Sequence, residues 1–260
     1  MLVFPRAAAL LVAFLFAASA QFASAQFNDR GRQVAKGLPS PRTADGHIDF
    51  SGVYHAPGYG PGDPPIKNGE TIARNIARDL DENAVPLLPS ARELMRQRAE
   101  TNSKDDPEGL CLPMGTPRKD PYPWKFVQTP TLLLILYEGN VHSYRQIFLD
   151  GRSHDPDAID TWWGDSIGHW EGDTLVVDTI GFLPGFLNPP VRNSDQLHVV
   201  ERFTLDPKKM ALTRSYLAED PVYLKGKYSG SDTILVADAP YNPGACKELN
   251  FIDYSKEHKR

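Results

Sequence analysis

The chain has 260 residues, a formal net charge of −5 and a hydrophobic content of 41%. This length suits one large all-β domain or two small ones, and the hydrophobic content is that of a globular protein, which excludes disorder as the overall state. Charges of both signs are interspersed along the chain with a small acidic excess, which argues against nucleic acid as a partner.

The first 25 residues have the pattern of an export signal. Arg6 precedes an apolar run from Ala7 to Ala18, and the Ala-Ser-Ala at 23–25 provides the small residues of a cleavage site. The run is too short for a membrane-spanning helix. We therefore expect a periplasmic or secreted protein that begins at Gln26 and has no membrane anchor after cleavage.

Residues 26–123 are rich in proline and glycine, which prevent continuous strand pairing. We expect this region to wrap over a core formed elsewhere, with 26–68 mostly as surface coil. Two short helices are predicted within it, at Glu70–Leu80 and Ser90–Glu100. The second begins with a capping box formed by its first and fourth residues, a serine and a glutamate.

Residues 124–260 are predicted to form an antiparallel β core with a C-terminal tail, in one domain with 26–123. Short β-branched and aromatic runs alternate with turn residues, as is typical of a meander. A long meander removes its exposed edges by closing, so we predict a mainly β, lipocalin-like barrel of about eight to ten strands, with a two-sheet sandwich as the alternative. The predicted strands are Lys125–Gln128, Leu132–Glu138, Ser143–Leu149, Ser166–Trp170, Thr174–Ile180, His198–Leu205, Ala211–Leu217, Tyr223–Ser229 and Thr233–Val236, with hairpin turns at Gly172–Asp173, Asp206–Lys209 and Gly230–Ser231.

The chain has two cysteines, Cys111 and Cys246. In an oxidising compartment an isolated pair is typical of a disulfide rather than of a catalytic thiol. We therefore predict a Cys111–Cys246 bridge that ties the irregular first half of the chain to the C-terminal tail.

Two segments carry a recognisable motif pattern: GHWEGDTLVVDTIGF ends at Phe182, and SDQLHVVERF ends at Phe203. These segments resemble those of a group of exported bacterial β-rich proteins to which no reaction is assigned. The resemblance spans most of the mature chain and implies no activity. The chain differs from the pattern at His169, where an arginine is expected, and at Asp155, where a proline is expected, so any role of His169 belongs to this chain alone.

Strand alternation places a carboxylate inside the predicted barrel. Glu201 shares one face of its strand with Val199 and Phe203, and Arg145 shares a face with Ile147. Because a buried carboxylate needs a partner, we expect an interior ion pair between Arg145 and Glu201. The pair either fixes strand register or provides a carboxylate base with an arginine that stabilises an anionic substrate or intermediate.

The acidic loop at 150–165 combines carboxylates with His154 and two tryptophans. At a barrel mouth these groups suit acid–base chemistry and stacking on a sugar or an aromatic ring, whereas a purely solvated loop is the alternative. The spacing matches neither a zinc nor a calcium pattern, so no metal is predicted. His154 and Trp163 are placed at the rim. The candidate catalytic residues are His154, His169, His198, Glu201 and Arg145, and the candidate ligand-binding residues are Trp162, Trp163, Asp165 and Tyr144.

The sequence contains no nucleophile elbow, phosphate-binding loop, zinc-protease motif or dinucleotide fingerprint, and no cofactor is predicted. A small molecule is the predicted partner. We expect a cofactor-free lyase, isomerase or hydrolase that uses histidine and carboxylate groups for proton transfer. A periplasmic lipocalin-like binding protein for an apolar or aromatic ligand, and an accessory protein of the cell envelope, are the alternatives.

Overall fold

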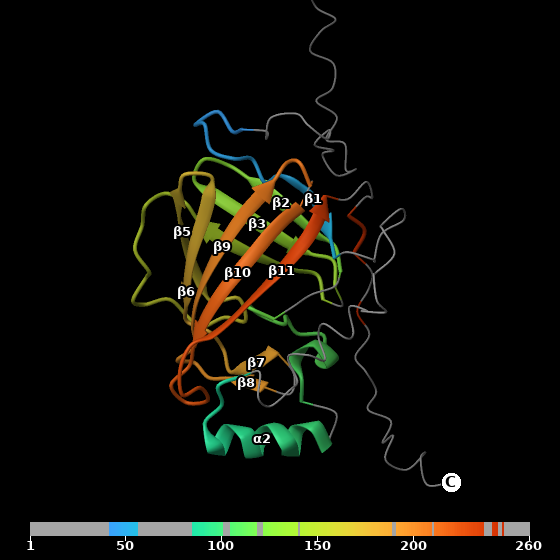
Figure 1. Ribbon diagram of the computed structural model, residues 1–260, viewed down its shortest axis with the longest axis vertical. Helices are drawn as coiled ribbons and strands as arrows, with labels where there is room; N and C mark the ends of the chain where they lie inside the picture. The colour runs from blue at the N-terminus through green and yellow to red at the C-terminus, as the bar shows by residue number, and fades with distance from the viewer. Residues whose placement is uncertain are drawn as a thin grey trace, which may run out of the picture.

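Nine strands of the chain close into a single β-barrel (Figure 1). The structure, a computed structural model, describes residues 42–56, 85–100, 105–118, 122–139, 141–188, 191–209, 211–236, 241–243 and 246. The strands follow one another around the barrel in the order β1-β11-β10-β9-β6-β5-β4-β3-β2. The predicted mainly β, lipocalin-like barrel is therefore confirmed, and the sandwich is not the arrangement observed.

The barrel strands are antiparallel to their neighbours except at one place. β4 and β5 meet in parallel at Phe148 and Ile167, because the crossover at 149–164 returns the chain to the end of the barrel where β4 began. The strands are β1 (Gly52–His55), β2 (Trp124–Gln128), β3 (Leu132–Tyr137), β4 (Ser143–Phe148), β5 (Asp165–Glu171), β6 (Thr174–Ile180), β9 (His198–Asp206), β10 (Ala211–Glu219) and β11 (Tyr228–Val236).

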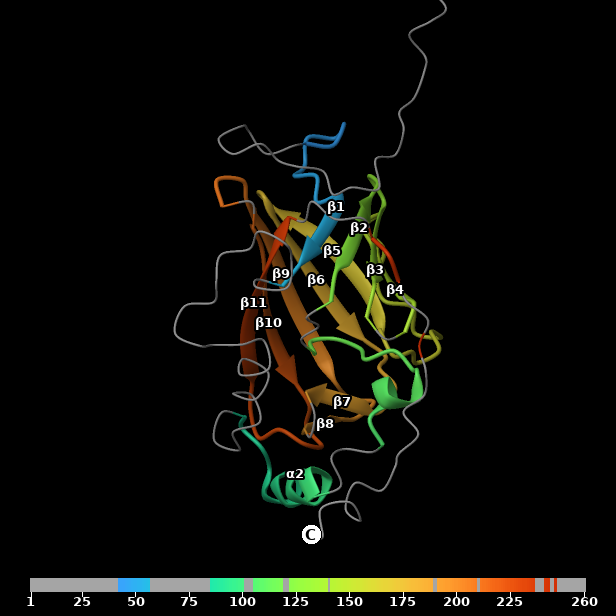
Figure 2. The same ribbon diagram turned by 90° about the vertical axis from the view of Figure 1, so that its right-hand side faces the viewer.

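Smaller elements cover one end of the barrel. The hairpin of β7 (Gly185–Asn188) and β8 (Val191–Asn193) lies between the barrel and helix α2 (Pro89–Glu100), whereas residues 42–50 lie at the opposite end (Figures 1 and 2). The short 3₁₀ helix η2 (Pro107–Leu110) leads into Cys111. In the described part of the chain, no helix has the length and apolar character that crossing a bilayer requires.

The core follows from alternation along the strands. In β9, for example, Val199, Glu201 and Phe203 are buried, whereas His198 and Arg202 point outward. One apolar cluster fills the barrel and a second joins its end to α2. The barrel cluster includes Phe50, Tyr54, Trp124, Phe126, Leu133, Ile135, Tyr137, Ile147, Trp163, Leu175, Val177 and Phe203, and the second includes Met95, Phe182, Leu187, Leu197, Val199, Tyr216 and Tyr228.

The predicted surface coil at 26–68 is wrong over its described part, 42–56. β1 pairs with both β2 and β11 and so closes the barrel. Ile48 and Phe50, which precede β1, belong to the core. This strand of four residues has little alternation of its own. Its place in the barrel is fixed by pairing with segments far away in the sequence.

β11 is one strand of nine residues, where two strands and a hairpin turn at Gly230–Ser231 were predicted. Gly230 lies directly opposite Tyr216 of β10, and a Cβ built on Gly230 would approach the Tyr216 hydroxyl oxygen to 2.2 Å. The glycine therefore admits a close aromatic ring within the strand and does not mark a turn.

Helix α2 confirms the second predicted helix but not its predicted cap. The helix begins at Pro89, so Ser90 lies inside its first turn, and the Arg92 amide donates to the Leu88 carbonyl at 2.9 Å. Proline is common at the first helical position because its missing N–H has no intrahelical acceptor there. The helix predicted at 70–80 and the predicted export signal lie outside the described residues.

The predicted disulfide between Cys111 and Cys246 is present. Nearby, the Tyr241 hydroxyl donates to the Tyr137 carbonyl at 3.1 Å, which attaches the C-terminal segment to the end of β3. The bridge thus joins the 105–118 segment to a part of the chain that lies against the barrel.

Candidate functional site

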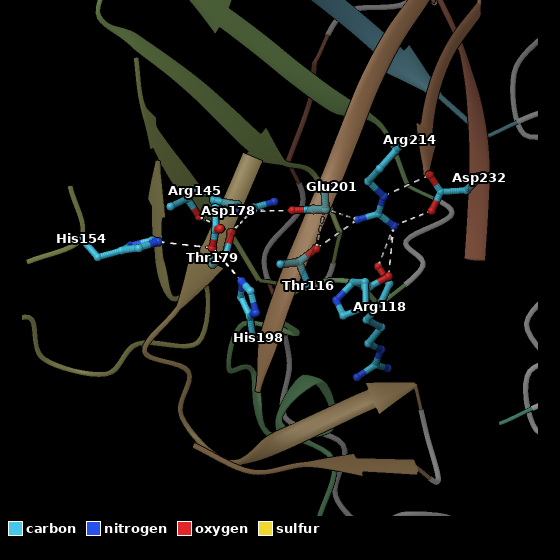
Figure 3. A network of polar contacts seen from close by, with 12 residues as sticks. Thr116, Arg118, Arg145, His154, Asp178, Thr179, His198, Glu201, Arg214 and Asp232 are labelled. Atoms are coloured by element: carbon cyan, nitrogen blue, oxygen red, sulfur yellow. Dashed lines mark hydrogen bonds and ion pairs between the residues drawn. The ribbon is translucent and has the colours of Figure 1, made fainter. Parts of the chain in front are cut away.

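The predicted ion pair between Arg145 and Glu201 lies inside the barrel. Arg145 of β4 is 1% exposed and Glu201 of β9 is fully buried, and Arg145 Nη2 lies 2.5 Å from Glu201 Oε2. Figure 3 shows the two side chains pointing toward each other. The interior orientation of both residues, which follows from alternation, is as the sequence predicts.

A second arginine shares the same carboxylate. Glu201 Oε1 accepts a hydrogen bond from the Thr116 hydroxyl at 2.8 Å and lies 3.3 Å from Arg214 Nη1. Arg214 also donates through Nε to Asp232 Oδ1 at 3.1 Å, and through Nη2 to the other oxygen of Asp232. The result is a continuous line from Arg145 through Glu201 and Arg214 to Asp232, which we call the interior network (Figure 3).

The opposite charges of the interior network keep Glu201 and Arg214 ionised although both are buried. Burial by itself would raise the pKa of Glu201, but the positive charges of Arg145 and Arg214 lower it below its usual value. Burial would likewise lower the pKa of Arg214, but Asp232 and Glu201 raise it above its usual range. A carboxylate stabilised in this way between two guanidinium groups is a weak base, which favours the structural interpretation of the Arg145–Glu201 pair over the catalytic one.

The interior network also fixes neighbouring segments to the barrel wall. Arg145 donates to the hydroxyls of Ser166 and Thr179 at 3.1 and 2.8 Å. Arg214 donates to the backbone carbonyls of Pro117 and Arg118 at 3.1 and 3.2 Å. These bonds hold the 105–118 segment against the inner wall.

Two of the candidate histidines meet on the outer face of the barrel. His198 Nε2 lies 2.8 Å from Asp178 Oδ1, and His154 Nε2 lies 3.3 Å from the same oxygen. The other ring nitrogen of His154 lies 2.8 Å from Asp165 Oδ2, and His198 Nδ1 lies 4.0 Å from Glu219 Oε2. We call these five residues the outer histidine cluster.

Neighbouring strands and one loop position this cluster. Asp165, Asp178, His198 and Glu219 come from β5, β6, β9 and β10, which follow one another around the barrel, and His154 comes from the 149–164 crossover. Each side chain points away from the core because the residues beside it in its strand point inward. The crossover is thereby fastened to the barrel wall through His154.

The outer histidine cluster can exchange protons. A neutral imidazole has one donor and one acceptor nitrogen, so His154 can satisfy both of its carboxylates only when it is protonated. The side chains of Asp178 and His198 are 40% and 39% exposed, which leaves them accessible to a dissolved molecule. Within the described ranges, no group of three or more histidine, cysteine or acidic side chains is placed to hold a metal ion.

The structure does not combine the histidines with Glu201 and Arg145 in one site. Asp178 and Thr179 are consecutive in β6, and Asp178 binds the histidines outside while Thr179 binds Arg145 inside (Figure 3). The single predicted arrangement of histidine base, carboxylate and arginine is therefore replaced by two networks on opposite faces of the same strand.

Two further candidates lie apart from both networks. His169 points outward from β5, is 65% exposed and lies 3.4 Å from Glu171. Tyr144 is 60% exposed on the outer face of β4. Neither residue contacts the outer histidine cluster in any described hydrogen bond or ion pair.

The two tryptophans of the crossover face the protein and not a rim. Trp163 is 7% exposed and stacks on Tyr137 with ring centroids 4.2 Å apart, so its predicted rim position is wrong. Trp162 is half-buried, with its ring against Gly185 and its carbonyl close to Gly115. Gly164, which follows Trp163, has a positive φ of 69°, and a Cβ there would lie 2.6 Å from the Ile180 carbonyl oxygen. Only glycine fits this tight turn into β5.

Sequence reasoning missed Asp178, Thr116 and Arg214. Alternation within the predicted strand does separate Asp178 from the inward-facing residues beside it, which was a usable signal. The register between β6 and β9, which brings Asp178 close to His198, depends on the β7–β8 connection and has no local signature. Thr116 enters from a segment without regular structure, which carries no periodic signal at all.

No protein-family model, curated protein or solved structure matches this chain. The resemblance to a group of exported β-rich proteins therefore stays a prediction. A barrel fold is shared by proteins of many functions and does not select a reaction.

Proposed function

We propose that this protein is an exported, cofactor-free acid–base catalyst that acts on a small molecule at the outer histidine cluster. The observation that carries the proposal is that two imidazoles share one carboxylate oxygen, Asp178 Oδ1, on an accessible face. Histidine is the side chain that most often transfers protons in enzymes, and such transfer needs no cofactor.

His198 is the residue best placed to accept a proton from a substrate. Its Nε2 is 2.8 Å from Asp178 Oδ1, which fixes the ring with that nitrogen protonated. Its Nδ1 is 4.0 Å from Glu219, beyond hydrogen-bond reach, so this nitrogen keeps its lone pair for an incoming proton. The imidazolium formed in this way is stabilised by Asp178 and Glu219 together.

His154 has a positioning role in this proposal. It lies between Asp165 and Asp178, so in its protonated form it holds the Asp178 carboxylate in the orientation that His198 requires. Loss of His154 should therefore lower the rate through Asp178 and not abolish it.

Export is part of the proposal and rests on the predicted signal at 1–25. The disulfide is compatible with an oxidising compartment and supports this location. Mass spectrometry of protein recovered from the periplasm or the medium should give a chain that begins at Gln26.

The chemistry can be tested without knowledge of the natural substrate. In 5-nitrobenzisoxazole, removal of one carbon-bound proton by a base breaks the ring N–O bond and releases a coloured cyanonitrophenolate. We expect the protein to accelerate this ring opening above the buffer rate. His198→Gln should lower the rate by about tenfold or more, since general bases commonly contribute at least that much.

His169→Gln is the matched control. His169 is an outward-facing histidine of the same barrel with a carboxylate beside it, but it lies outside the cluster. Its replacement should leave the rate unchanged. Equal losses in His169→Gln and His198→Gln, or no loss in His198→Gln, would contradict the proposed function.

A further inference from the structure

Three N–H groups buried inside the barrel have no hydrogen-bond acceptor among the described residues. They are Trp124 Nε1, Trp163 Nε1 and Arg145 Nη1. The residues that carry them are 1%, 7% and 1% exposed. Buried donors are nearly always paired, so three of them in one region indicate an acceptor that the described part of the chain does not provide.

Two of the three donors lie against one aromatic ring, and the third is carried by the adjacent strand. Trp163 stacks on Tyr137 at 4.2 Å, and Trp124 meets the same ring edge-on at 5.2 Å. Arg145 lies on the adjacent strand, where it pairs with Ile135, so Tyr137 is its diagonal neighbour on the inner face. Planar apolar surfaces and polar N–H groups thus occur together in one part of the interior.

Charge decides which acceptor suits this region. Arg145 and Arg214 are balanced by Glu201 and Asp232, which leaves the interior network without net charge. A further anion would lose its hydration without gaining an unpaired cation as partner, which costs much free energy. A neutral oxygen loses far less when it is buried. A neutral carbonyl oxygen therefore fits the three donors better than a carboxylate does.

We infer that the barrel interior holds a binding site for a neutral aromatic carbonyl compound, in which Trp124, Trp163 and Arg145 donate to the carbonyl oxygen. The aromatic body of the ligand packs among the rings around Tyr137. This site does not depend on the proposed catalysis, because the outer histidine cluster lies on the other face of β6 and shares no residue with it.

The indole N–H groups provide a direct test. In protein labelled with nitrogen-15 at tryptophan, acetophenone should move the Nε1–H resonances of Trp124 and Trp163 downfield. The resonance of Trp170, whose ring lies beside His47 in a different part of the interior, should stay in place. Ethylbenzene, which has the same shape without the carbonyl oxygen, should bind at least tenfold more weakly.

Two variants separate donation from stacking. Trp124→Phe and Trp163→Phe keep an aromatic ring and remove the N–H, so each should weaken acetophenone binding several-fold or more, whereas Trp162→Phe should not. The catalytic variant His198→Gln should bind acetophenone as the unmodified protein does, which separates this inference from the proposed function.

Three results would overturn the inference. If acetophenone moves neither resonance, the donors are served by an ordered water only. If ethylbenzene binds as tightly as acetophenone, the carbonyl oxygen has no role. If benzoate binds more tightly than acetophenone, the site is an anion site and the charge argument is wrong.

Discussion

Two ion pairs of this protein have the same N–O distance but differ in burial. Arg145–Glu201 and Arg202–Glu171 both have an N–O distance of 2.5 Å, but the first is inside the barrel and the second is half-exposed on its outer face. Removing one partner of a buried pair leaves the other charge desolvated, whereas water and salt compensate an exposed charge. Equal geometry should therefore have unequal consequences.

Glu201→Gln should lower the free energy of unfolding by about 3 to 5 kcal/mol, because it leaves Arg145 and Arg214 buried with only Asp232 to balance them. Glu171→Gln, the matched control, should change stability far less. Denaturant unfolding followed by circular dichroism measures both. Similar losses in the two variants would mean that Glu201 is solvated and that the interior network is misplaced.

The same carboxylate gives stability a pH dependence of known sign. Because the folded-state pKa of Glu201 is below its usual value, its ionisation stabilises the fold at pH values above the ordinary glutamate range. This contribution is lost as pH falls through the folded-state pKa. Unfolding free energy should therefore decline on acidification below about pH 4.5, and Glu201→Gln should remove part of that decline. An unchanged acid profile in the variant would contradict the assignment.

At the level of single elements, β1 closes the barrel although the local sequence does not predict a strand there. It pairs with β2 through Gly52–Tyr54 and with β11 through Tyr54 and His55. In native-state hydrogen exchange the amides of Val53 and Tyr54 should therefore be protected to a degree comparable with those of β3. Rapid exchange in β1 together with slow exchange in β3 would show an open barrel.

The elements differ in how well local pattern predicts them. β3 and β9 alternate between buried and less buried residues, so their faces and the burial of Glu201 follow from the sequence. β1 is held by partners far away in the chain, and β11 contains a glycine that a turn would also use. Both were mispredicted because long-range pairing, and not local propensity, determines them.

At the level of the whole molecule, the disulfide joins segments 135 residues apart. In the chain-entropy account, a bridge that closes a loop of this length stabilises the folded state by about 5 kcal/mol, although measured values are often smaller. The double variant Cys111→Ser with Cys246→Ser should melt at a lower temperature. At 25 °C it should retain the rate of ring opening, because neither cysteine belongs to the outer histidine cluster. Loss of that rate in a folded double variant would place the disulfide in the catalytic arrangement.

The overall architecture was predictable, whereas the composition of the candidate site was only partly so. Export, the disulfide and the barrel were predicted from composition and alternation, and the structure confirms the last two. The partnership of His154 with His198 required the fold, because the two residues are 44 positions and four strands apart in the sequence. Only the closed sheet brings Asp178 between them.

The central claim is that His154 and His198 act together through Asp178, and a double-variant rate measurement tests it most directly. We expect His154→Gln and His198→Gln each to slow the opening of 5-nitrobenzisoxazole, and the double variant to be no slower than the slower single variant, because groups that act as a unit have non-additive effects. Unchanged thermal unfolding would show that all three variants remain folded. Losses that multiply in the double variant, or no loss in either single variant, would contradict the claim.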